Sequence, residues 1–153
     1  MWLLYHIRDV REMVPVAYCT HKPPYERQKG RIEMKRDLDL IRNLLLAIEE
    51  APSGLYLQPD DFLPVCDDLD KIVFHLELLD DARFIESIDA STTLCDSIVV
   101  KRMTFAGCDY LDAVRNKAIW ERIREKLVPF GGQVSLEIVK ELGISFVKQQ
   151  LMS

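Results

Sequence analysis

The chain has 153 residues, of which 48% are hydrophobic and 29% are charged, and its formal net charge is −5. This composition is typical of one globular domain and excludes a disordered chain. No apolar run approaches the roughly 18 residues that a membrane helix needs, which excludes a membrane-spanning segment. The apolar residues 1–5 are followed at once by polar ones, so they do not form a secretory signal.

The four cysteines, Cys19, Cys66, Cys95 and Cys108, are widely spaced. They form no CxxC pair and no cluster with histidine, so neither a zinc site nor a redox pair is indicated. Because no export signal is present, we expect four reduced thiols in a cytoplasmic protein.

The charge is unevenly distributed along the chain. Residues 1–33 contain six basic and four acidic residues, whereas 14 basic and 21 acidic residues follow from Met34 onward. A protein that binds nucleic acid usually has the opposite sign, since its affinity comes largely from neutralising phosphates. DNA binding by this chain would therefore require a local basic patch.

Residues 1–33 read as an N-terminal extension to a domain at residues 34–153. Pro23 and Pro24 favour an extended segment, and no sustained helical or strand period precedes them. The tripeptide at residues 29–31, Lys-Gly-Arg, can be encoded by a purine-rich run like a ribosome-binding site just upstream of the Met34 codon. We therefore expect this extension to be largely a translated leader. The alternative is a genuine arm that packs on the domain.

The first half of the domain combines two amphipathic helices with a short strand. Apolar residues recur every three or four positions in residues 34–50 and again in residues 67–81, which predicts a helix in each range. Residues 55–58 favour a short strand. The proline-bounded link at residues 59–64 is too short for a full helix.

The second half begins with a predicted β-hairpin and continues with helices. Residues 84–88 and 97–103 have strand-like patterns and flank a polar loop. Helices are predicted over residues 106–117 and 119–127, with Thr104 as a plausible N-cap of the first. A last helix, capped by Ser135, is predicted to run to about Leu151. Helix, short strand, helix and β-hairpin wing, with a helical C-terminal extension, predict an α+β winged-helix-like domain.

Several sequence blocks from Met34 onward carry a resemblance to a known family. They are residues 34–42 (MKRDLDLIR), residues 75–79 (HLELL) with Ala82, Phe84 and Ile85, residues 102–107 (RMTFAG), residues 110–115 (YLDAVR) with Trp120, and residues 131–136 (GGQVSL). Over residues 34–153 the chain resembles domain-of-unknown-function family 2513 of bacteria and phages. The resemblance implies a winged helix and suggests phage or prophage origin. It implies no activity, cofactor or catalytic residue.

The chain departs from the family at the end of the second helix, where Arg83 occupies a position at which we expect glycine. Glycine is favoured there because it adopts a positive φ without steric cost. If the backbone is the same, Arg83 costs about 1 kcal/mol. Ala106 likewise stands where an acidic residue is more usual.

The helix at residues 67–81 occupies the position of a recognition helix, whose exposed residues would enter the major groove of DNA. These residues are mostly acidic here, and among the base edges Asp and Glu can accept hydrogen bonds only from cytosine. We therefore expect this surface to bind a protein, unless the charges serve only to keep the helix solvated. The predicted interaction face consists of Asp67, Asp68, Asp70, Lys71, Phe74, His75 and Glu77.

The basic residues offer an alternative, a DNA-binding transcriptional regulator. Its phosphate contacts would be Lys35, Arg36, Lys101 and Arg102. A further group of five basic residues, Arg115, Lys117, Arg122, Arg124 and Lys126, is interleaved with Glu121 and Glu125. Ion pairing within one helix is the expected arrangement of these charges.

No residue pattern supports an enzyme. His75 is the only histidine of the domain and has no motif partner for a triad or a metal site. The Gly131–Gly132 pair lacks the Lys-Ser or Lys-Thr of a phosphate-binding loop. We therefore expect no catalytic residue, no cofactor and no bound metal.

Two remaining features bear on burial and assembly. Trp120 is expected to lie in the core. In the last helix Ile144, Val147 and Leu151 form a second apolar stripe, which either packs on the domain or forms a homodimer seam. The sequence thus favours a non-enzymatic interaction module that binds an unidentified protein partner or itself, with no membrane contact.

Overall fold

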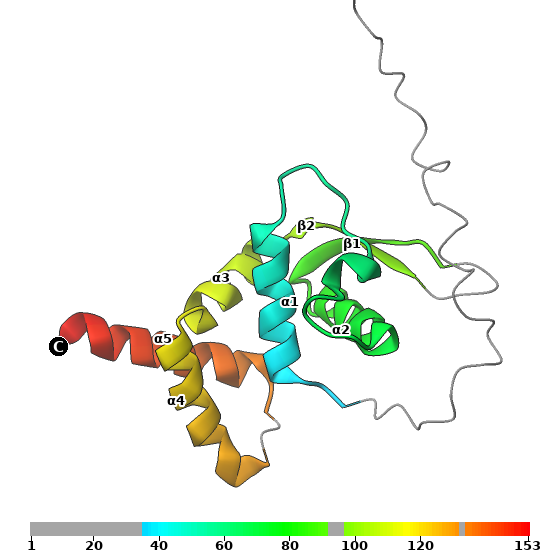
Figure 1. The fold of residues 1–153 in the computed structure, drawn as a ribbon. Coiled ribbons are helices and arrows are strands. Elements are labelled where there is room, and N and C mark those ends of the chain that lie inside the picture. The colour runs from blue at the N-terminus through cyan, green and yellow to red at the C-terminus, as the bar shows by residue number, and fades with distance from the viewer. Residues whose placement is uncertain (1–34, 92–96, 132–133) are drawn as a thin grey trace, which may run out of the picture.

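The computed structural model describes residues 35–91, 97–131 and 134–153 (Figure 1). These residues form five α-helices, two short 3-10 helices and one antiparallel hairpin, which confirms the α+β class. The predicted extension at residues 1–33, together with Cys19 and Cys95, lies outside the described residues.

Helix α1 (Leu38–Glu50) lies at the centre of the molecule, between α3 and α2 (Figure 1). It begins later than the predicted residue 34 because Asp37 has an extended backbone, with φ −108° and ψ 108°. The Asp37 carboxylate accepts a hydrogen bond from the Leu40 N–H at 3.1 Å and thereby caps the helix. The buried face of α1 consists of Leu40, Ile41, Leu44, Leu45 and Ile48.

A short 3-10 helix, η4 (Pro59–Phe62), precedes α2 (Leu69–Asp81). Only this single turn fits between the two long helices, in agreement with the prediction for residues 59–64. Helix α2 starts two residues later than predicted because Asp68 is its N-cap, with Oδ1 accepting from the Lys71 N–H at 3.1 Å.

Helix α2 ends at its C-cap, Ala82, and the next residue, Arg83, is left-handed, with a φ of 58°. The Arg83 N–H donates to the Asp80 carbonyl at 2.8 Å, and the Phe84 N–H donates to the Leu79 carbonyl at 2.9 Å. These bonds satisfy carbonyl groups that the helix end would otherwise leave unpaired. The prediction that Arg83 occupies a conformation favoured by glycine is confirmed.

The hairpin pairs β1 (Ile85–Asp89) with β2 (Ile98–Met103). Its register places Ile85 opposite Met103 and Ile88 opposite Val99, with an irregularity between Glu86 and Ser87. The predicted strand at residues 55–58 is reduced to one isolated bridge, in which Leu57 and Val100 exchange two backbone hydrogen bonds of 2.9 and 2.8 Å. A turn at residues 53–54 precedes this bridge, and η4 follows it.

Three helices follow the hairpin: α3 (Phe105–Val114), α4 (Lys117–Leu127) and α5 (Leu136–Met152), with the 3-10 turn η5 (Val128–Phe130) before α5. Thr104 and Ser135 cap α3 and α5 as predicted. Helix α3 ends at Val114 rather than residue 117 because Asn116 caps α4. The last turns of α5 project from the domain (Figure 1).

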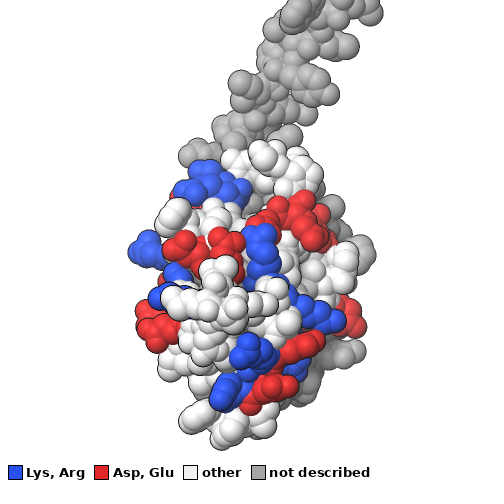
Figure 2. Space-filling view, turned by 90° about the vertical axis from the view of Figure 1, so that its left-hand side faces the viewer, with Lys and Arg blue, Asp and Glu red and all other residues white. Residues whose placement is uncertain are grey.

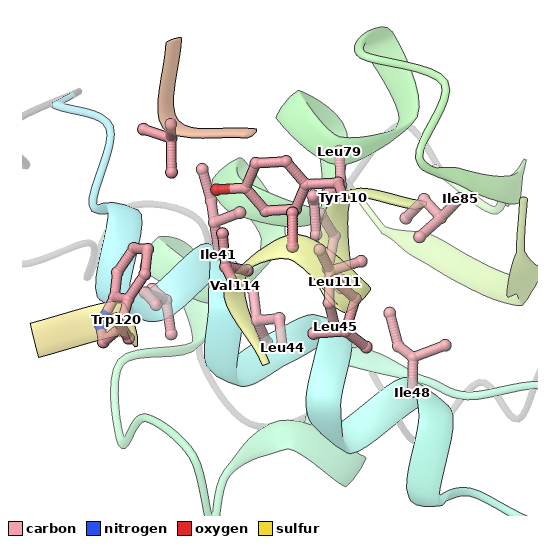
Figure 3. Close-up of a cluster of buried hydrophobic side chains, with 14 of the residues drawn as sticks. Ile41, Leu44, Leu45, Ile48, Leu79, Ile85, Tyr110, Leu111, Val114 and Trp120 are labelled. Atoms are coloured by element: carbon pink, nitrogen blue, oxygen red, sulfur yellow. The ribbon is translucent and has the colours of Figure 1, made fainter. Parts of the chain in front are cut away.

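The core lies where α1, α2, α3 and the hairpin meet (Figure 3). Trp120 belongs to it, as predicted, and its Nε1–H donates to Asp39 at 2.8 Å. Helix α5 approaches α3 so closely that a Cβ atom at Gly143 would lie 2.3 Å from the Ala113 carbonyl oxygen. Glycine is therefore required at this crossing.

Candidate interaction surface

Carboxylates cover η4 and α2. Residues 59–81 contain eight of them, which we call the acidic surface, and one lysine, Lys71. The acidic surface consists of Asp60, Asp61, Asp67, Asp68, Asp70, Glu77, Asp80 and Asp81; Asp80 is half-buried and the other seven are exposed. Asp70, Phe74, Glu77 and Asp81 follow the helical repeat and share one face of α2. The predicted face is therefore strongly negative where it meets solvent.

Two members of the acidic surface also stabilise the local backbone. Asp61 Oδ2 accepts from the Gln58 N–H at 2.7 Å, and Asp68 caps α2. Asparagine is as good an N-cap as aspartate. The charge of Asp68 can consequently be removed without removing the cap.

Lys71 is not a free cation on this surface. Its Nζ lies 2.8 Å from Oδ2 of Asp37, the residue that caps α1. The hydrogen bond to Asp37 raises the pKa of Lys71 above its ordinary value. The one positive charge of residues 59–81 is thus used to join α2 to the start of α1.

The placement of His75 on the interaction face is wrong, because its side chain is fully buried, with 0% exposed. Its Nε2 accepts from the Asp37 N–H at 2.8 Å, and its Nδ1 lies 2.7 Å from the Lys71 carbonyl oxygen. Burial lowers the pKa of His75 below 6.5, so the neutral form is favoured. A histidine on an amphipathic helix can satisfy both ring nitrogens through the backbone, which the sequence pattern did not reveal.

The structure does not bring the four predicted phosphate contacts together. Lys35 and Arg36 precede the N-terminus of α1. Lys101 and Arg102 instead line a groove together with Ile48, which lies near the C-terminal end of α1. The 13 residues of α1 separate the two pairs by about 20 Å.

Lys101 and Arg102 also share a carboxylate partner, Glu86. Arg102 forms a two-bond ion pair with it, and Lys101 Nζ lies 3.6 Å away. The hydrogen bond from Arg102 lowers the pKa of Glu86, so this carboxyl is ionised at neutral pH. A phosphate would have to compete with Glu86 for Arg102 and, through a longer contact, for Lys101.

The expected ion pairing within α4 is replaced by contacts with other helices. Arg124 Nε lies 3.5 Å from Asp39 of α1, and Arg122 stacks over the ring of Phe146 in α5. Arg115, just before α4, pairs with Glu49 and Asp112. On the face in Figure 2, basic and acidic side chains alternate around an uncharged area, without a continuous basic patch.

The second apolar stripe of α5 is only partly covered by the domain. Val147 packs against the core, whereas Ile144 is 37% exposed and Leu151 is 82% exposed. The stripe is therefore not buried as a whole.

Other kinds of site find little support in the described residues. No three His, Cys, Asp or Glu side chains gather there in a group that could hold a metal ion. Cys66 and Cys108 are free thiols. None of the helices in residues 35–91, 97–131 and 134–153 is long and apolar enough to cross a membrane.

Two features of the surface lay outside the sequence prediction. Asp60 and Asp61 of η4 extend the acidic surface, and counting carboxylates before the helix would have found them. A groove of about 410 Å³ lies between residues 51–57 and β2. It is formed by segments far apart in the chain, so no local pattern indicates it.

Comparison with known proteins identifies the family. A family profile described as hypothetical protein, DUF2513, matches residues 35–132. An uncharacterized protein of Haemophilus influenzae is 31% identical over 119 residues, which cover 77% of this chain and 99% of the relative. No solved structure matches significantly. The resemblance predicted from the sequence is confirmed, and the chain belongs to the DUF2513 family of hypothetical proteins.

Proposed function

We propose that this chain is a non-enzymatic interaction module, whose acidic surface binds a basic surface on a partner protein or on a second copy of the chain. The observation that carries the proposal is the charge of residues 59–81, with eight carboxylates and one lysine that is already paired with Asp37. Such a surface repels phosphates and attracts cationic side chains, and both effects weaken as salt screens the charges.

The position of two of these charges, Asp80 and Asp81, supports a role in binding rather than in stability. Asp80 and Asp81 lie in the last turn of α2, which has no basic residue. A carboxylate at the C-terminal end of a helix opposes the helix dipole, at a cost of about 0.3–1 kcal/mol. Charges placed against local stability are common at functional surfaces.

We also propose a winged-helix architecture, in which α2 occupies the recognition-helix position and β1–β2 form the wing. The element order and the bridge of Leu57 to Val100 support it, because a short strand after the first helix then pairs with the second strand of the hairpin. In such a fold the carboxylates of α2 would bind a host protein at the site where that protein binds the phosphates of DNA. The module would then act as an inhibitor of a DNA-binding or DNA-processing protein.

The test begins with affinity capture from the native host and identification of the partner by mass spectrometry. Binding of that partner is then compared between the wild-type protein and the triple variant Asp67→Asn, Asp68→Asn, Asp70→Asn, which retains the N-cap at position 68. We expect weaker binding by the variant and a loss of wild-type affinity as salt rises.

A matched control removes three exposed carboxylates elsewhere, with Glu121→Gln, Glu125→Gln and Glu137→Gln. This control should bind as the wild type does. Equal affinity of the α2 variant and the wild type would refute the acidic surface as the binding site.

The alternative, a DNA-binding regulator that uses Lys35, Arg36, Lys101 and Arg102, has weaker support. Its two basic pairs lie at opposite ends of α1, and one pair is held by Glu86. A mobility-shift assay with duplex DNA at low and moderate salt separates the alternatives. Salt-sensitive retardation that Lys101→Gln and Arg102→Gln abolish would favour the regulator.

We also propose that the protein is encoded by a phage or prophage, that it is cytoplasmic and that it forms a homodimer. Genes for phage structural or replication proteins beside this one would support the origin. Sedimentation of the wild type and of a Leu151→Ser variant tests whether the exposed stripe of α5 joins two copies.

A further inference from the structure

The groove between residues 51–57 and β2 lies on a part of the surface distinct from α2. The loop that forms one wall leaves the end of α1 and arches beside β2 (Figure 1). The other wall is formed by Val100, Lys101, Arg102 and Met103. The volume of about 410 Å³ lies within the range of sites that bind ligands or peptide side chains.

The strand on one wall of the groove has an unpaired edge. Within residues 35–91, 97–131 and 134–153, the side of β2 away from β1 pairs only with Leu57, through one bridge at Val100. Residues 101–103 have no strand partner on that side among the described residues, and all three line the groove. An open strand edge can bind an extended peptide through main-chain hydrogen bonds.

The opposite wall exposes apolar side chains. Leu55 is 57% exposed and Tyr56 is 47% exposed. Tyrosine is enriched where proteins bind one another because its ring is apolar and its hydroxyl remains hydrated. This wall therefore suits an apolar side chain of a bound segment.

The charges on the β2 wall favour an acidic occupant of the groove. Lys101 and Arg102 contribute two cations, and Glu86 provides one carboxylate for both. Arg102 holds Glu86 through two hydrogen bonds, whereas Lys101 forms a longer ion pair with it, at 3.6 Å, and its side chain is 51% exposed. Two cations beside one carboxylate leave the β2 wall with one net positive charge, although the whole chain is acidic.

We propose that this groove binds an extended acidic segment of a partner protein, which adds to the free edge of β2. A carboxylate of the segment would pair with Lys101, and a neighbouring apolar side chain would lie against Leu55 and Tyr56. This second site is independent of the acidic surface and selects the opposite charge.

The test uses ¹⁵N-labelled full-length protein and defined capped peptides. Ac-Glu-Val-Glu-Val-Glu-NH₂ is expected to cause saturable amide shifts at residues 55–57 and 100–103. Ac-Lys-Val-Lys-Val-Lys-NH₂ should cause none there. N-methylation of the central Glu of the acidic peptide keeps its carboxylate but removes a main-chain donor, and it should weaken binding.

Two variants of exposed groove residues sharpen the test. Lys101→Glu and Tyr56→Ser should each weaken binding of the acidic peptide by about tenfold or more, while circular dichroism confirms that they fold. Lys117→Glu makes the same charge change at an exposed site on α4 and should leave the affinity unchanged.

Three outcomes would overturn the proposal. They are no shifts at millimolar acidic peptide, equal shifts with the basic peptide, and shifts by duplex DNA at the same residues. Shifts there that depend on protein concentration without any peptide would identify a second copy as the occupant and also overturn it. Binding by the α2 triple variant is expected to be unchanged, which separates this test from that of the acidic surface.

Discussion

The backbone N–H of Asp37 donates a 2.8 Å hydrogen bond to Nε2 of His75 and so joins the start of α1 to the middle of α2. Nδ1 lies 2.7 Å from the Lys71 carbonyl oxygen, so the neutral ring donates there and accepts from Asp37. The side chains of Asp37 and Lys71 are the charged groups beside it, and Phe74 contacts the ring edge-on. Protonation of Nε2 would place its N–H opposite the N–H of Asp37, so this hydrogen bond would be lost.

This geometry predicts a loss of stability in mild acid. Because burial lowers the folded-state pKa of His75 below the unfolded value of 6.5, the unfolded chain binds more protons below that pH. The stability contributed by neutral His75 is therefore complete above about pH 6.5 and falls as the pH drops towards the folded pKa. Urea unfolding between pH 8 and 5 measures this decline.

The His75→Gln variant provides the reference for that experiment. Its side-chain oxygen can accept from Asp37, and it does not titrate. Subtracting its stability from that of the wild type removes the contribution of the carboxylates. A difference that does not change between pH 7 and 5 would rule out His75 as the titrating group.

Arg83→Gly is predicted to stabilise the protein. Arg83 has a φ of 58°, which glycine adopts without the steric cost of a Cβ atom. We expect an increase of about 0.5–1 kcal/mol in the free energy of unfolding, measured by urea denaturation. Ala82→Gly, at a φ of −72°, is the matched control and should lower stability.

Gly143→Ala should weaken the contact between α5 and α3. The added Cβ would lie 2.3 Å from the Ala113 carbonyl oxygen, so the helices must move apart. A decrease of about 1–3 kcal/mol in the free energy of unfolding is expected. Ser145→Ala, at an exposed position of the same helix, should change stability little, and an equal loss in both variants would contradict the role of the crossing.

Tyr110→Phe should leave stability unchanged or raise it slightly. The Tyr110 ring is fully buried, and its hydroxyl has no hydrogen-bond partner among the described residues. Burial raises its pKa, which keeps the hydroxyl protonated. Removing an unpaired buried hydroxyl costs nothing in packing, whereas Tyr110→Ala should lower stability by about 3–5 kcal/mol. Thermal unfolding compares the two variants.

Asp81→Lys should stabilise α2, since it replaces a carboxylate at the negative end of the helix dipole by a cation. The expected gain is about 0.3–1 kcal/mol in the free energy of unfolding at low salt, diminishing as salt screens the charge. Measuring stability and partner binding on the same variant tests whether this charge opposes stability but favours binding.

The local elements could be predicted from the sequence because their causes are local. Apolar residues at helical spacing identify α1 and α2, and the N-caps Thr104 and Ser135 fix the starts of α3 and α5. The misfit of Arg83 with a glycine position was also visible, since a left-handed C-cap depends on a few neighbouring residues. The charge of residues 59–81 is a property of the sequence alone.

Only the tertiary structure decided which of those residues remain exposed and which contact one another. His75 and Lys71 bind Asp37 where α2 meets the start of α1. Arg115 and Arg124 form ion pairs with residues of α1. Lys101 and Arg102 line a groove whose other wall lies some 45 residues earlier in the chain. Hydrophobic period and capping act over one or two turns, so they specify elements. Burial of a polar group and pairing of a charge depend on segments brought together by packing, and neither leaves a signal in the local sequence.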